Sequence, residues 1–378
     1  MRAPLPPMFI DIGGHDLDLG GDGMKMCALY FLRSLPSRKG LVRRMCFIFF
    51  LHLGMTVIAN AQSREVEEFY KSKPINFIVG FNTGGSADAY ARLIGRHISR
   101  HIPGSPTVAI RNMQGAGSLN AANYIYNVSQ RDGSEIGLFA GHLTIDPAIS
   151  EGAFKYDAQK FGFIGSPSAA VNVCISRKGS TFTSLNDVIK NEMIIGTTGA
   201  AGNSTYDMPT ILNNVVGSKF KLVKGYAGSA ALNMAMERGE IEGFCGVGLD
   251  YLRGAGLAEG NANILIQVGL VKSAQLPLVP FIMDHPMSED DRQIMRFVFG
   301  WLNFERVIVA PPGVPQARFE AFREGFEVTM RDRLFLEDAQ QAKLDIEAMR
   351  GADISKFLVE AYQTPLAIRQ KAAKYLGR

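Results

Sequence analysis

Short apolar runs alternate with stretches of helical periodicity along the chain from residue 74 onward. Residues 75–80 form an apolar run, and residues 87–101 then place apolar side chains three and four positions apart, as on one face of an amphipathic helix. The same alternation predicts a strand, a helix and a strand over 107–111, 117–128 and 136–140. Repeated strand–helix–strand units favour an α/β fold with a parallel sheet that helices cover on both faces.

The second half of the chain continues in this way. Strands are predicted over 171–176, 193–196, 220–224, 241–245, 264–268 and 307–310. Helices are predicted over 203–216, with Asn203 or Ser204 as N-cap, and over 229–238, and the tail 315–378 is mostly helical. The length of 378 residues predicts about two domains. Because no low-complexity linker separates them, we expect two chain crossings, with domains at 62–169 plus 305–378 and at 170–304.

The first 61 residues have a different pattern. A basic stretch, 37–44, precedes an apolar run, 45–58, that ends in Ala59-Asn60-Ala61. A positive segment, an apolar segment and a small-residue cleavage site form a secretory signal peptide. The run is shorter than the roughly 20 residues of a membrane-spanning helix, so a membrane anchor is the lesser alternative. We predict cleavage after Ala61. More than forty residues precede the run, which indicates a translation start drawn too far upstream.

The net charge of the chain is distributed unevenly between the predicted signal segment and the remainder. The 378 residues include 40 Lys+Arg and 36 Asp+Glu, a formal charge of +4. The predicted signal segment holds seven of these basic and four of these acidic residues, so the exported chain carries +1. With a charge near zero and no clustering of basic with aromatic residues, nucleic-acid binding is excluded.

Two cysteines, Cys174 and Cys245, remain after the predicted cleavage. In an oxidising compartment they either pair or stay as buried thiols, and the sequence leaves both open. They lie 71 positions apart with no C-x-x-C motif, which argues against redox or zinc chemistry. His97 and His101 share one helix at positions i and i+4, the spacing of a metal pair, but no H-E-x-x-H motif accompanies them. A solvated helix face is the preferred interpretation, and we expect no metal and no cofactor.

Two loops of small residues each follow a predicted strand and precede a predicted helix. They are Asn82–Asp88, which contains Gly84-Gly85, and Thr197–Thr205, which contains Gly199 and Gly202. Glycines let successive backbone N–H groups point into one concavity, and a helix N-terminus adds positive potential, so such loops suit a carboxylate or phosphate. A plain tight turn is the competing interpretation of either loop alone. No G-x-G-x-x-G dinucleotide motif is present.

Seven segments, in order, resemble the Bug (TctC-type) family, the substrate-binding proteins of tripartite tricarboxylate transporters. They are Val79–Asp88, Asn112–Ala121, Asp132–Ile136, Ile145–Ala148, Tyr226–Gly228, Leu276–Pro280 and Ala310–Pro315. The resemblance runs from about Lys73 to the C-terminal helices. It implies a two-domain periplasmic-binding-protein fold of type II, with a carboxylate (an aliphatic di- or tricarboxylate or an aromatic acid) in the cleft between the domains. It also implies a periplasmic location and delivery to membrane permease subunits, and we expect a monomer.

The resemblance also implies a set of ligand-binding residues. In the first loop these are Thr83, Gly84, Gly85 and Ser86, and in the second Ala200, Ala201, Gly202, Asn203 and Ser204. His142 and Thr144 are expected at a further cleft position, with a structural role as the alternative for His142. Asp88 is expected to brace its own loop more than to meet the ligand. Two departures are present. Asn82-Thr83 replaces a Pro-rich start, and Gly246 stands in the segment where many relatives carry an Asp-Asn pair, which leaves room for a bulkier or more apolar ligand.

Two other classes of protein compete with this interpretation. A periplasmic receptor that feeds a membrane sensor kinase would show the same sequence features. An α/β hydrolytic enzyme could use Ser86, His142 and Asp88 as a triad, but no G-x-S-x-G elbow surrounds a serine, and such an elbow positions the nucleophile of that class. We therefore expect a binding protein without catalytic residues.

Overall fold

The computed structural model describes residues 63–149, 154–199, 202–258 and 260–378. The chain divides by its contacts into Met1–Ala61 and Gln62–Arg378, and the description below concerns the second unit. The predicted signal peptide and the predicted site residues Ala200 and Ala201 lie outside the described residues. Within the described ranges, no helix combines the length and the hydropathy needed to cross a bilayer.

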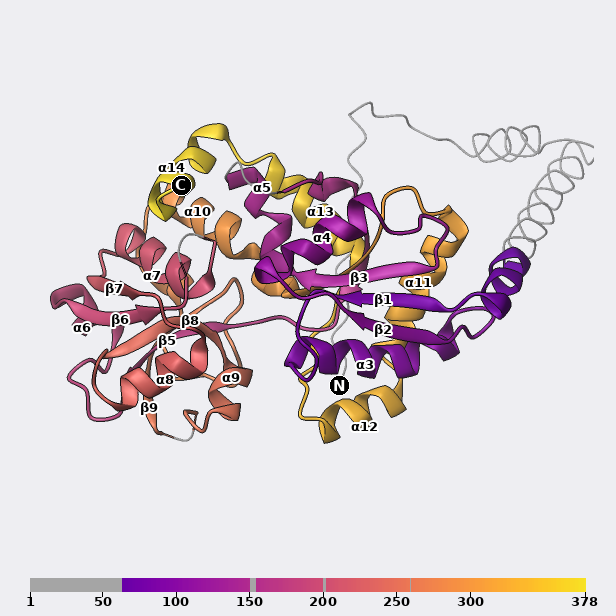
Figure 1. Cartoon of the computed structure of the whole chain (residues 1–378). Helices are drawn as coiled ribbons and strands as arrows, with labels where there is room; N and C mark the ends of the chain where they lie inside the picture. The colour runs from indigo at the N-terminus through magenta and orange to yellow at the C-terminus, as the bar shows by residue number, and fades with distance from the viewer. Residues whose placement is uncertain (1–62, 150–153, 200–201, 259) are drawn as a thin grey trace, which may run out of the picture. The chain divides into compact units, whose positions relative to one another are not determined.

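The first sheet combines strands from the two ends of this unit (Figure 1). Its order is β11(Met349–Arg350), β4(Gly162–Ser166), β10(Arg306–Ala310), β3(Glu135–Ala140), β1(Ile75–Val79) and β2(Val108–Asn112). β1 is parallel to β2 and β3, whereas β10 is antiparallel to β3 and β4. The predicted strands at 75–80, 107–111, 136–140 and 307–310 are confirmed, and β4 and β11 were not predicted.

The second sheet is built from the middle of the chain, and its strands follow an equivalent order. It runs β7(Phe220–Lys224), β6(Met193–Thr197), β8(Gly243–Gly248), β5(Asn172–Arg177) and β9(Ala262–Val268). β6 is parallel to β7 and β8, and β5 is antiparallel to β8 and β9. The chain enters the first sheet from the second at β10, and it enters the second sheet from the first at β5. β10 lies antiparallel between β3 and β4, and β5 lies antiparallel between β8 and β9. The prediction of a parallel sheet is wrong for β10 and β5, because no crossover helix within the same sheet fixes their direction, and it is also wrong for β11, which pairs antiparallel with β4.

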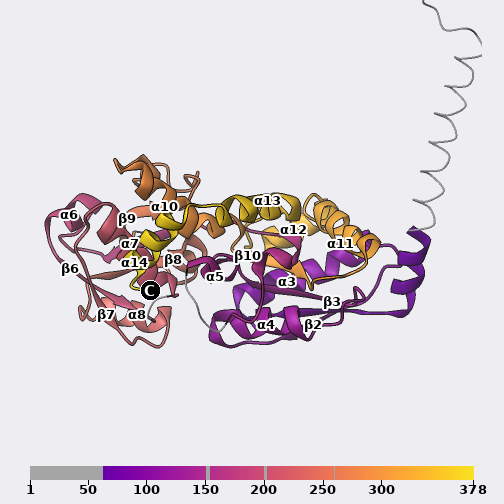
Figure 2. The same cartoon turned by 90° about the horizontal axis from the view of Figure 1, so that it is seen from above.

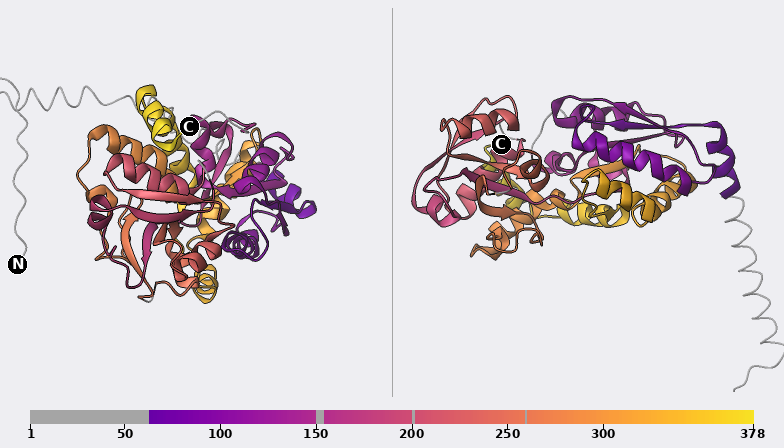
Figure 3. Two further views of the ribbon diagram at one scale, coloured as in Figure 1. Left: turned by 60° about the vertical axis from the view of Figure 1, so that its left-hand side comes forward. Right: turned by 90° about the horizontal axis from the view of Figure 1, so that it is seen from below.

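Helices cover the faces of both sheets (Figures 1 and 3). Their bounds are α3(Ser86–Ile98), α4(Leu119–Asn127), α5(Asp146–Ile149), α6(Leu185–Lys190), α7(Ser204–Val215), α8(Ser229–Glu237), α9(Leu249–Gly254), α10(Glu289–Phe299), α11(Gln316–Thr329), α12(Arg333–Gln341), α13(Gly351–Tyr362) and α14(Leu366–Leu376). Residues 63–72 are also helical. The predicted helices at 87–101, 117–128, 203–216 and 229–238 and the helical tail are confirmed, and the α/β fold class is thereby confirmed.

The C-terminal helices bring both sheets into one packed structure. α13 packs on β4 of the first sheet, and α14 packs on α7 and α10 beside the second sheet, as Figure 2 shows for the yellow end of the chain. One hydrophobic core includes Phe139 and Phe163 of the first sheet, Ile195 of the second, and Trp301 between β9 and β10 in sequence. This core holds β6 and α7 on either side of the second loop, whereas α3, which follows the first loop, packs in a separate core that includes Ala91 and Ile94.

The two remaining cysteines form a disulfide. Cys174 on β5 and Cys245 on β8 face each other in the antiparallel pairing, and both are fully buried. The bond therefore links β5 to its neighbour β8. Of the two possibilities that the sequence left open, the cysteines are paired and are not free thiols.

Candidate ligand-binding site

The first loop ends at the N-terminus of α3, with Gly85 as the N-cap residue. Gly84 has φ +84°, a left-handed conformation that glycine adopts without a steric penalty. The Gly84 amide donates a hydrogen bond of 2.9 Å to Oδ2 of Asp88 in the first turn of the helix. Thr83, Gly84, Gly85 and Ser86 are all exposed, so the loop presents its backbone to solvent.

Asp88 is buried and holds this loop to its surroundings. Besides the Gly84 amide, its carboxylate accepts from Arg92 Nε at 2.8 Å and from Asn112 Nδ2 at 2.9 Å. Burial raises the pKa of Asp88, but the hydrogen bonds from Arg92, Gly84 and Asn112 outweigh it and leave the pKa below its ordinary value. Asn112 Nδ2 also donates to the Phe81 carbonyl. Asp88 lies where a loop-bracing role requires it.

The second loop has the same plan. Asn203 is the N-cap residue of α7, and its Oδ1 accepts from the Thr205 amide at 3.0 Å. The Gly202 amide donates to Asp207 in the first turn, at 3.0 Å to Oδ1. In both loops, therefore, a glycine amide is held by an aspartate of the helix that follows. Ser204 begins the helix, so the described part of this loop places three of its five predicted residues at a helix N-terminus.

The backbone at Gly246 lies directly against the second loop. It has φ +77°, and a Cβ at this position would lie 2.3 Å from the Ser204 carbonyl oxygen. The backbone of β8 and the start of α7 are thus in direct contact. Gly246 offers no side chain to a ligand and instead sets how closely the loop approaches the sheet.

His142 and Thr144 lie in a 3₁₀ turn, Gly141–Thr144, that directly follows β3. The His142 ring packs edge-on against Trp301 with 5.5 Å between centroids, and its Nε2 lies 3.9 Å from Asp146 Oδ2. Burial lowers the pKa of His142, against the raising effect of Asp146, and so favours the neutral imidazole. Thr144 is fully buried and donates to the Gly141 carbonyl at 2.8 Å. Its hydroxyl therefore serves the conformation of the turn.

Asp146 and Asp207 share a partner, Arg378, that the sequence did not indicate. Arg378 donates from Nη1 to Asp146 Oδ1 at 3.1 Å and from Nη2 to Asp207 Oδ2 at 2.5 Å. Its side chain is 7% exposed. Arg378 therefore joins the His142 turn to the second loop, and no local pattern could reveal a contact among three positions so far apart in sequence.

Asp207 gives this site a pH dependence. Burial raises its pKa to about 7, against the lowering effect of Arg378 and the Gly202 amide. Because the folded pKa lies above the unfolded one, the contribution of Asp207 to stability is present below about pH 4 and is lost as the pH rises towards 7. Between pH 4.5 and 7.5 the wild type should lose about 2–4 kcal/mol more of its free energy of unfolding than Asp207→Asn, measured by urea denaturation. Parallel stability curves would contradict this assignment.

The interpretation of His97 and His101 as a solvated face is wrong for His97. His97 is buried where α12 packs on α3, and its Nε2 lies 2.8 Å from Asp338 Oδ2, while His101 Nε2 lies 2.8 Å from Asp332 Oδ2. Arg100 Nη2 donates to His97 Nδ1, so that nitrogen carries no proton and Nε2 is the donor to Asp338. Among the described residues, no group of His, Cys, Asp and Glu side chains could hold a metal ion.

The three residues of the hypothetical triad have separate partners. Ser86 Oγ accepts from Arg306, Asp88 is bound as described above, and His142 packs on Trp301. Within the described ranges, no hydrogen bond joins any two of these three residues. A pocket elsewhere, of about 440 Å³, is lined by residues of α10 and α13 that include Arg292 and Arg296. None of the predicted site residues that the structure describes lines it.

No protein-family model matches the chain. The chain is similar to the UPF0065 protein in the TAR-I ttuE-ttuC' intergenic region of Agrobacterium vitis, with 27% identity over 313 residues, 80% of this chain and 84% of that one. A TctC solute-binding protein from Polaromonas has a TM-score of 0.61 at 17% identity, covering 81% of this chain and 99% of that one.

Two further solved structures share the fold and were obtained with an acid bound. MatC from Rhodopseudomonas palustris, with malate, has a TM-score of 0.58 at 16% identity and covers 80% of this chain and 99% of that one. An R. palustris protein with adipate has a TM-score of 0.59 at 19% identity and covers 81% and 98%. The fold is therefore that of solute-binding proteins. The resemblance to the Bug (TctC-type) family is confirmed, and none of these four proteins is named as an enzyme.

Proposed function

We propose that the chain is a periplasmic solute-binding protein that captures a small carboxylate for a tripartite tricarboxylate transporter. The observation that carries the proposal is the pair of glycine loops, each at a helix N-terminus and each held by an aspartate in the first turn. Backbone N–H groups at helix N-termini bind carboxylates without a basic surface, in keeping with the charge of +1 of the exported chain. The acids named in two structures of the same fold, malate and adipate, agree with this ligand class.

In this proposal, separate segments of the chain have separate roles. Residues 1–61 would direct export and be removed after Ala61. Residues 62–169 with 305–378, and residues 170–304, would form two domains that close on the ligand by a hinge motion. Each of these proposed domains would contain one sheet and one glycine loop. Membrane permease subunits would then receive the ligand, and no covalent chemistry is required.

A thermal-shift screen of the exported protein tests this function. The probes are malate, succinate, adipate and benzoate, with the corresponding amides as matched controls. An acid at about 100 times its Kd should stabilise the chain by about 2.7 kcal/mol, and hence raise Tm by about 5 °C. Trp301 is the single tryptophan and lies against His142, so its fluorescence should report the same titration. If no acid raises Tm more than its amide does, the assigned ligand class is wrong.

A further inference from the structure

Arg306 is a buried cation that contacts both the first loop and α9. It is the first residue of β10 and pairs with Ala140, next to the His142 turn. Its side chain is 9% exposed, and its guanidinium carbon lies 4.8 Å from the centroid of the Tyr90 ring on α3. An arginine in such a place must remain paired, because leaving its charge buried without a partner is strongly unfavourable.

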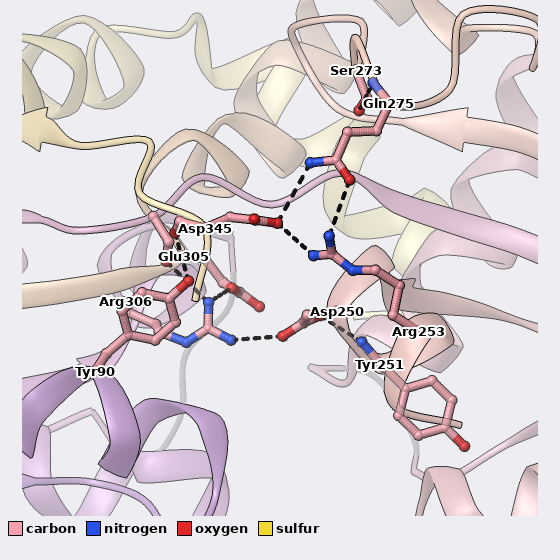
Figure 4. A network of polar contacts seen from close by, with 10 residues as sticks. Tyr90, Asp250, Tyr251, Arg253, Ser273, Gln275, Glu305, Arg306 and Asp345 are labelled. Atoms are coloured by element: carbon pink, nitrogen blue, oxygen red, sulfur yellow. Dashed lines mark hydrogen bonds and ion pairs between the residues drawn. The ribbon is translucent and has the colours of Figure 1, made fainter. Parts of the chain in front are cut away.

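The guanidinium joins the first loop to α9 beside the second sheet. Nη2 donates to Ser86 Oγ at 3.0 Å and to Asp250 Oδ2 at 3.2 Å, and Nη1 donates to Ser168 Oγ at 3.0 Å and to the Glu305 carboxylate. Figure 4 shows the guanidinium pointing across to Asp250, which lies on the opposite side. The nitrogen that meets Ser86, a residue of the first loop, is thus the one that meets Asp250.

The two acidic partners of Arg306 are not equivalent. Glu305 is its neighbour in sequence, with a side chain 29% exposed, whereas the Asp250 side chain is 50% exposed. One guanidinium is neutralised by one carboxylate, so the second acid adds repulsion. Burial raises the pKa of Glu305, Arg306 lowers it, and Asp250 raises it further. Asp250 is the partner that can move into water at low cost, because half of its surface is already hydrated.

We propose that Arg306 is the ionic anchor for one carboxylate of the ligand, and that Asp250 holds its place until the ligand arrives. A carboxylate bound at the amides of the first loop lies beside Ser86, whose hydroxyl already contacts Arg306 Nη2. Exchange of Asp250 for that carboxylate keeps the guanidinium paired, and the positive charge of Nη2 favours a carboxylate over a neutral amide. This inference rests on the proposed function and adds a residue that determines ligand specificity.

The test compares the dissociation constants of three variants with the wild type. The probes are the acid with the largest thermal shift in the screen above and the corresponding amide. Arg306→Gln should weaken binding of the acid by about 10- to 100-fold, while the affinity for the amide should change little. Glu305→Gln combined with Arg306→Gln removes the buried guanidinium together with its neighbouring carboxylate, so it should show the same loss with a folded chain. Asp250→Asn removes the competing acid and should strengthen binding of the acid by about 3- to 10-fold.

The outcomes separate this inference from the proposed function. If the wild type binds the acid and the double variant keeps both its affinity and its discrimination against the amide, Arg306 is not the anchor and the proposed function stands. Equal losses for acid and amide would assign Arg306 a structural role only and overturn the proposal. Weaker binding by Asp250→Asn would contradict the place-holding role of Asp250. If the wild type binds no acid at all, the proposed function fails as well.

Discussion

Gly246→Ala is expected to lower the free energy of unfolding by about 3–5 kcal/mol and to weaken carboxylate binding at the second loop. Gly246 has φ +77°, and an added Cβ would lie 2.3 Å from the Ser204 carbonyl oxygen and 2.7 Å from the Thr205 amide nitrogen. Both are backbone atoms at the start of α7, so the clash is relieved only if the helix start moves away from β8. Urea denaturation measures the stability, and Trp301 fluorescence titration measures the affinity.

Gly254→Ala is the matched control for this substitution. Gly254 ends α9, and a Cβ there would meet nothing within 4 Å. Its free energy of unfolding should change by less than about 0.5 kcal/mol. Equal stability of the two variants would show that the contact between β8 and the second loop is not tight, and the account of Gly246 as a backing residue would then be wrong.

Asp88→Ala is expected to cost about 2–4 kcal/mol of the free energy of unfolding and to reduce affinity for the ligand at the first loop. The substitution removes the acceptor of the Gly84 amide and leaves Arg92 and Asn112 without their buried partner. Asp88→Asn keeps one acceptor oxygen and should lose less. Asp290→Ala, at a site whose side chain is 62% exposed, is the control and should stay within about 0.5 kcal/mol of the wild type. An Asp88→Ala chain as stable and as tightly binding as that control would exclude the bracing role.

The elements that the sequence predicted are those with a strong local period. β1, α3 and α7 have clear apolar spacing and recognisable ends, and tertiary packing did not override them. β4, with the sequence Gly-Phe-Ile-Gly-Ser, was missed because glycine at two of five positions weakens strand propensity. The direction of β5 and β10 was wrong, since it depends on how the chain passes between sheets, a property that no local period records.

The candidate site divides in the same way. The two glycine loops were predictable because a strand, a small-residue turn and a helix start are adjacent in sequence. The contacts of Arg306 with Ser86 and Asp250, and of Arg378 with Asp146 and Asp207, join positions far apart in the chain. Acidic and basic residues are common throughout the sequence, so nothing marks these particular ones before the fold brings them together. The burial of His97 was missed for a related reason, because it depends on α12 docking on α3.

The central claim is that the two glycine loops hold a carboxylate, and a crystal structure of the protein with its best stabilising acid tests it most directly. If this claim is right, a carboxylate of that acid lies within hydrogen-bonding distance of the backbone amide of Ser86, of those of Asn203 and Ser204, or of both, because the Gly84 and Gly202 amides already donate to Asp88 and Asp207. Location of the acid in the pocket beside Arg292 and Arg296 of α10, with both loops unoccupied, would contradict it.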